Sequence, residues 1–131
     1  MRRLFPGLLA LSLVPLAGCS AYVDHLVPRL KEYRVAILVR PVNGQCRTTT
    51  IPALAVVSPT QDIVWDVVSV DPRACDPGQV TVTPKKASPG FDIVRGELAQ
   101  TLVVRHLPIG RYAYTVAIPG WTEDPELEVW R

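Results

Sequence analysis

One stretch near the C-terminus decides the fold: Leu107-Pro108-Ile109-Gly110-Arg111-Tyr112-Ala113-Tyr114-Thr115-Val116-Ala117-Ile118. From Tyr112 onwards, a large apolar side chain occupies every second position, with Ala or Thr between. A period of two residues is typical of a β-strand with one buried face. Because successive side chains of a strand point to opposite faces, Tyr112 and Tyr114 share one side. The stretch therefore predicts a strand whose tyrosines fill the core between two sheets.

The same period recurs along the rest of the chain at short, regular intervals. Turn residues separate the alternating segments, and the 13 prolines are spread through connections, where they would break most long helices. No window shows the 3.6-residue stripe of an amphipathic helix. The sequence predicts one all-β domain, a Greek-key sandwich. Its strands are expected over residues 33–40, 46–51, 54–57, 63–70, 80–83, 91–94, 100–105, 111–118 and 127–130, with a turn over residues 41–44.

The N-terminus has the pattern of a secretory signal peptide. Arg2 and Arg3 precede an apolar run over residues 4–16, which is too short to span a bilayer, and small residues follow. The run closes with Leu16-Ala17-Gly18-Cys19, which resembles the lipobox of bacterial lipoproteins. That resemblance implies cleavage before Cys19 and a diacylglyceryl group on its thiol. The alternative is an ordinary cleaved signal in which Cys19 is incidental.

The lipobox resemblance also implies where the protein is found. Ser20 follows the cysteine, whereas an aspartate there favours retention in the inner membrane in the better-known Gram-negative systems. We therefore expect a lipid-anchored protein of the bacterial envelope, at the outer membrane and facing the periplasm. The expected organisation is a signal peptide over residues 1–18, a lipidated N-terminus with a short connector over residues 19–32, and the sandwich over residues 33–131.

The charge balance excludes one class of partner. Arg2 and Arg3 are lost with the signal peptide, so 12 basic side chains face 12 acidic ones in the remaining 113 residues. The longest run of basic residues there is Lys85-Lys86. Nothing in this balance would attract a phosphate backbone, so we expect no nucleic-acid partner.

The three cysteines have different predicted roles. With Cys19 as the lipid site, Cys46 and Cys75 form one pair, and in an oxidising compartment such a pair is expected to be a disulfide. The alternative is a pair of metal-binding thiolates. Neither cysteine lies in a C-x-x-C spacing and neither has a nearby histidine in the sequence, which favours the disulfide.

The C-terminal two thirds resemble the cupredoxin-like sandwiches. The resemblance rests on Asp62-Ile63-Val64-Trp65, on Gly110-Arg111-Tyr112-Ala113-Tyr114, and on a closing Asp124-Pro125-Glu126-Leu127-Glu128-Val129. It covers about residues 51–131 and implies the same kind of two-sheet fold. An immunoglobulin-like sandwich fits the strand pattern as well.

The copper chemistry of that family does not carry over to this chain. A type 1 copper site needs two histidines and a cysteine thiolate, usually with a weak axial methionine. The family's cysteine ligand would lie near Val116, and its histidine and methionine would fall in Ile118-Pro119-Gly120-Trp121. The first histidine would follow the Trp65 strand, where residues 67–70 hold none, and Met1 is the only methionine. We therefore expect no metal site and no cofactor.

Few residues are candidates for catalysis. His106 could be a general base or a metal ligand, although a solvated loop histidine is the simpler interpretation, and His25 lies in the connector. The sequence has no G-x-S-x-G elbow and no nucleophile with a base beside it. A loose acidic group comprises Asp62, Asp66, Asp71 and Asp76. It could bind calcium, but its spacing is typical of solvated turn carboxylates and differs from that of a calcium-binding loop.

The tryptophans are the candidates for partner binding. Trp121 lies in a turn-forming segment, and an exposed indole is a frequent binding hot spot. The alternative is that Trp121 folds back over the sandwich edge. Trp65 is expected in the core, and Trp130 is expected to cover the sheet end.

Together these features predict a non-catalytic binding or assembly module. It would be held at the membrane by its lipid and would present loops or a sheet edge to another envelope protein. Two other classes stay open, a metal-handling protein suggested by the fold resemblance and a small hydrolase whose residues meet only in three dimensions.

Overall fold

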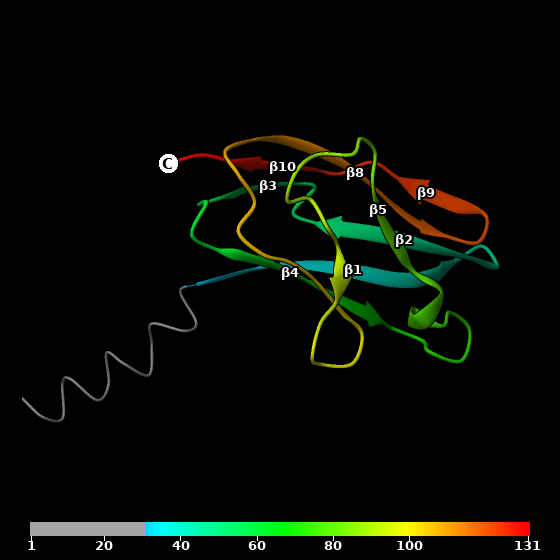
Figure 1. Cartoon of the computed structure of the whole chain (residues 1–131). Coiled ribbons are helices and arrows are strands. Elements are labelled where there is room, and N and C mark those ends of the chain that lie inside the picture. Colours follow the sequence, from blue (N-terminus) through cyan, green and yellow to red (C-terminus); the bar gives the residue numbers. More distant parts are fainter. Residues whose placement is uncertain (1–30) are drawn as a thin grey trace, which may run out of the picture. The chain divides into compact units, whose positions relative to one another are not determined.

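The computed structural model describes residues 31–131. The predicted signal peptide, Cys19, His25 and nearly all of the predicted connector lie outside the described residues. The unit over Glu32–Arg131 is a sandwich of two β-sheets (Figure 1). The predicted all-β Greek-key sandwich is confirmed, and its first strand begins one residue before the expected boundary.

The first sheet has the order β2-β1-β4-β7-β6. β1 and β2 form a hairpin, whereas β1 and β4 run parallel, so the sheet is mixed. β4 pairs with β7, and β7 with β6, both antiparallel. These strands are β1 (Glu32–Val42), β2 (Gln45–Ile51), β4 (Asp62–Ser69), β6 (Val94–Arg95) and β7 (Thr101–Val104).

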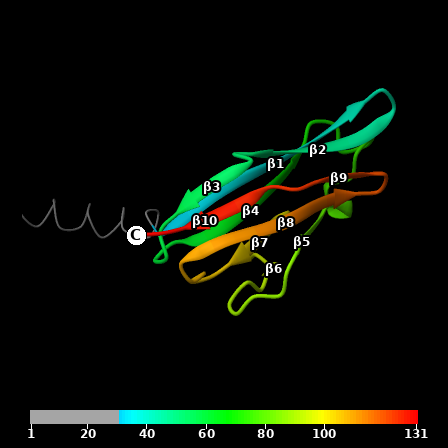
Figure 2. The same cartoon turned by 90° about the horizontal axis from the view of Figure 1, so that it is seen from above.

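The second sheet has the order β3-β10-β8-β5 and includes the short β9, which also pairs with β8 (Figure 2). β3 is parallel to β10, and β10 and β5 are antiparallel to β8. Because β2 and β3 are edge strands of different sheets, the chain crosses between the sheets at Pro52. The strands are β3 (Leu54–Val57), β5 (Thr81–Pro84), β8 (Gly110–Ile118), β9 (Trp121–Glu123) and β10 (Glu126–Val129).

The core lies between the two sheets and is centred on Trp65 and Tyr114. Both side chains are fully buried, and their rings meet edge-on with centroids 5.4 Å apart. The Trp65 Nε1–H donates to the Tyr114 hydroxyl at 3.2 Å. Burying two large rings in this geometry stabilises the contact between the sheets beyond the area that they bury. The core positions predicted for Trp65 and Tyr114 are confirmed.

Three local predictions are wrong by more than one residue. β1 continues through Pro41 to Val42, and the turn is confined to Asn43-Gly44, whose φ angles of 52° and 77° suit a two-residue hairpin. Phe91 lies before β6 rather than within it, and its side chain still fills the core against Tyr112. β9 begins at Trp121, where the sequence predicts only a turn.

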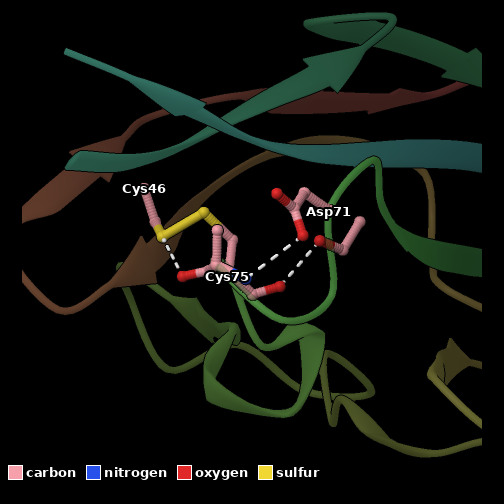
Figure 3. The surroundings of a disulfide bond; sticks show 5 residues. Cys46, Asp71 and Cys75 are labelled. Carbon is pink, nitrogen blue, oxygen red and sulfur yellow. Dashed lines mark hydrogen bonds between the residues drawn. A yellow bond between two sulfur atoms is a disulfide. The ribbon is translucent and has the colours of Figure 1, made fainter. Parts of the chain in front are cut away.

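The predicted disulfide between Cys46 and Cys75 is confirmed (Figure 3). Their Cα atoms are 5.6 Å apart, within the usual range for a bridge. Cys75 lies in the segment after β4, where its N–H donates to the Asp71 carbonyl at 2.8 Å and its carbonyl accepts from the Ser69 hydroxyl at 2.6 Å. The bridge ties the start of β2 to this segment.

Candidate interaction surface

The structure places Trp121 against the core. Its ring is partly buried and packs on the core cluster, and the Arg47 guanidinium lies 4.8 Å from the ring centroid. The indole Nε1 is buried and has no hydrogen-bond partner among the described residues. The predicted loop position of Trp121 is wrong, and its ring folds over the sandwich edge. Contact of Trp121 with a partner stays a prediction.

Trp130 is the tryptophan that faces solvent. Its backbone N–H donates to the Val57 carbonyl at 3.1 Å, which continues the β10–β3 ladder by one residue. Its side chain is 56% exposed, so the prediction that it covers the sheet end is wrong. Val129, the last residue of β10, is buried, and the exposed Trp130 directly follows it.

The four aspartates do not gather into one site. Asp66 accepts two hydrogen bonds from Arg34 Nη1, at 2.8 and 2.9 Å, and this pairing raises the pKa of Arg34. Asp71 and Asp76 each accept a backbone N–H in a local turn. Asp62 has a buried Oδ1 without a partner among the described residues. Within residues 31–131, no group of three or more His, Cys, Asp and Glu side chains could hold a metal ion.

His106 is exposed in the loop before β8, with a φ of 53°. Two solvent-open cavities of about 400 and 330 Å³ lie elsewhere on the described part of the chain, and His106 lines neither. The larger is bordered by the residues around Gly96 and Pro77, and the smaller by Arg34, Asp62 and Arg105. His106 therefore has the position of a solvated loop histidine. No helix in residues 31–131 is long and apolar enough to cross a membrane.

β3 is an edge strand with apolar side chains on both faces. Ala55 and Val57 point into the core, while Leu54 and Val56 are 43% and 47% exposed on the outer face. Ile51, at the end of β2, is exposed as well. We call Leu54 and Val56 the edge patch. Edge strands are usually protected by charged side chains, and β3 carries none.

The backbone of β3 is also available for pairing. Glu126 N–H donates to the Ala53 carbonyl at 2.9 Å, and Trp130 N–H to the Val57 carbonyl at 3.1 Å. In a parallel ladder only every second residue bonds to a given neighbour, so residues 53, 55 and 57 face β10. The N–H and C=O groups of Leu54 and Val56 point the other way, where the sheet formed by the described residues has no further strand.

Charged side chains flank the edge patch on the outer face. Glu126 lies opposite Leu54 in the register, and Glu128 opposite Val56. Arg111 of β8 forms a 2.7 Å ion pair with Glu126. The surface is therefore an apolar strip at the sheet edge with a polar rim, which is the usual arrangement of a protein–protein contact.

Sequence reasoning places β3 correctly but does not find the edge patch. Four consecutive apolar residues, Leu54 to Val57, indicate a strand that is apolar on both faces. Such a run also fits a strand buried on both faces. Only the strand order shows that β3 is an edge whose outer side chains are exposed.

Comparison with known proteins gives structural likenesses but no family. No family model matches the chain, and no curated protein matches its sequence. Eleven chains of solved structures match, including pseudoazurin from Methylobacterium extorquens AM1. That match has 24% sequence identity over 74% of this chain and 75% of the pseudoazurin chain, with a TM-score of 0.44. A likeness at this level carries no argument about function.

Proposed function

We propose that this protein is a non-catalytic binding or assembly module, anchored through a lipid on Cys19 at the outer membrane and facing the periplasm. The residues Leu16-Ala17-Gly18-Cys19 support the anchor, and the Cys46–Cys75 disulfide is suited to an oxidising compartment. Its partner is a second envelope protein.

The observation that carries the proposal is the unprotected edge of β3. Its outward N–H and C=O groups offer main-chain hydrogen bonds, and the exposed Leu54 and Val56 offer apolar contacts beside them. An extended segment that adds to a sheet edge uses both, with its backbone for affinity and alternate side chains for specificity. We infer that the partner contributes such a segment and extends the second sheet by one strand.

The two other classes have less support. A metal-handling role needs ligands, and residues 31–131 bring no set of them together. A hydrolase needs a base within reach of a nucleophile, and His106 is exposed and lines neither of the two cavities. Neither class has an observation in its favour beyond the fold.

A photocrosslinking residue introduced at position 56 of the full-length protein in cells tests the proposal. Position 68 is the matched control, because Val68 is 51% exposed but lies on β4, which is paired on both sides. We expect one specific envelope protein to crosslink from position 56 and not from position 68. The same partner from both positions, or none from position 56, contradicts the proposal. A probe at position 121 tests the predicted role of Trp121.

A further inference from the structure

We propose that one end of the sandwich, marked by Ile109 and Trp130, rests on the lipid headgroups of the membrane that holds the anchor. We call these two residues the terminal patch. The inference rests on the proposed function, because it requires the lipid on Cys19. It adds a second contact surface, a lipid one, to the protein-binding edge of β3.

The terminal patch is a pair of exposed apolar side chains at the ends of neighbouring strands, with Ile109 directly before β8 and Trp130 directly after β10. Gly110 of β8 lies opposite Val129 of β10. Each residue of the terminal patch is therefore one position beyond this last pair. Ile109 is 52% exposed and Trp130 is 56% exposed. The indole has an apolar body and a polar N–H, and such rings concentrate at the boundary between lipid and water.

The chain enters the sandwich at the same end. Both views place the start of β1 and the C-terminus, which directly follows Trp130, at one end of the two sheets (Figures 1 and 2). Cys19 is 13 residues before Glu32. A fully extended chain covers at most about 3.6 Å per residue, so the anchor keeps this entry point within about 47 Å of the bilayer.

The charges at this end suit a lipid surface that carries anionic headgroups. Arg105, Arg131 and Lys31 are all exposed and lie within a few residues of Ile109, Trp130 and the start of β1, while the acidic Glu32 at this end forms an ion pair with Arg34. Basic side chains beside an amphipathic ring are attracted to anionic lipids, and the anchor supplies the high effective concentration that a small contact needs. A protein surface could also cover two apolar residues, but it would not explain why they lie where the anchored chain enters.

Tryptophan quenching tests the contact. The processed protein, purified from cell membranes, is placed in vesicles of phosphatidylethanolamine and phosphatidylglycerol whose acyl chains are brominated. The protein has three tryptophans, and Trp65 is fully buried while Trp121 packs on the core. We expect the wild type to lose fluorescence relative to unbrominated vesicles, and Trp130→Phe to show little of that loss. Equal quenching of the two proteins overturns the inference.

Two controls separate the possible failures. Mass spectrometry of the same sample reads the mass of Cys19, and an unmodified Cys19 overturns the proposed anchor and this inference with it. Lipid on Cys19 with no quenching specific to Trp130 overturns the terminal contact alone. Leu98→Ser removes an apolar residue of similar exposure from the β6–β7 connection, and we expect its quenching to equal that of the wild type.

Discussion

Replacing Tyr114 by Phe removes a single hydroxyl from the centre of the core and leaves its ring in place. In the wild type, this hydroxyl accepts the hydrogen bond from Trp65 Nε1, and both side chains are fully buried. In Tyr114→Phe the indole N–H keeps its burial and loses its acceptor. A buried unsatisfied donor costs about 1–3 kcal/mol, so we expect the variant to be less stable by that amount near neutral pH.

The same hydroxyl makes the difference in stability depend on pH. Burial raises the pKa of Tyr114 to about 12, against an opposing effect of the hydrogen bond from Trp65. In the unfolded chain the pKa of a tyrosine is about 10. Because the unfolded chain releases the phenol proton first, the stabilisation is complete below pH 10 and is lost as the pH rises through 12. At pH 11 the loss amounts to about 1.4 kcal/mol.

Urea unfolding of the wild type and Tyr114→Phe at pH 8 and pH 11 measures both effects. Groups other than Tyr114 titrate in both proteins, so their contributions cancel in the difference of unfolding free energies. At pH 8 we expect the free energy of unfolding to be larger for the wild type than for Tyr114→Phe. At pH 11 we expect this difference to be smaller by about 1.4 kcal/mol. An advantage that is the same at both pH values would refute the argument from burial of Tyr114.

Three further predictions concern stability. Replacing both Cys46 and Cys75 by Ala should lower the free energy of unfolding by about 3.6 kcal/mol, because the bridge closes a loop over a separation of 29 residues and limits the entropy of the unfolded chain. Calorimetry against the disulfide-bonded wild type measures this loss, and a melting temperature equal to that of the disulfide-bonded wild type would contradict it. Gly96→Ala should lower the free energy of unfolding by about 1–3 kcal/mol, measured by urea unfolding, because the added Cβ would collide with Thr101 Oγ1. An unchanged free energy of unfolding would contradict this and would show that the β6–β7 connection can shift to make room. Glu123→Ala should lower the free energy of unfolding by about 1–3 kcal/mol, because it removes the two carboxylate oxygens that accept hydrogen bonds from Thr50 of β2. Glu123→Gln should lower it less, and thermal melts that show the opposite order would contradict this prediction.

The sequence predicts the strands best where a period of two is long and unbroken. β8 was expected over residues 111–118 and begins one residue earlier, at Gly110. β3 has its predicted bounds, Leu54–Val57, because Pro52 and Pro59 limit it on both sides. In these segments the local pattern and the packing agree, so the pattern alone is enough.

The failures occur where contacts distant in sequence decide the outcome. β9 has three residues after a Pro-Gly turn, and it exists because Trp121–Glu123 pairs with β8 and bonds to β2. The burial of Trp121 depends on Arg47, which is far from it in the sequence. The exposure of Trp130 and of the edge patch depends on the order of strands, which no local pattern contains.

Strand addition at β3 is the central claim, and the exchange of individual backbone amides tests it most directly. With the partner identified by crosslinking from position 56, hydrogen exchange of the free protein and of the complex is followed by NMR. We predict that the amides of Leu54 and Val56, which face the open edge, exchange fast in the free protein and slowly in the complex. Those of Ala55 and Val57, which face β10, should be slow in both. A bound partner that leaves the Leu54 and Val56 amides as fast as before would contradict the account.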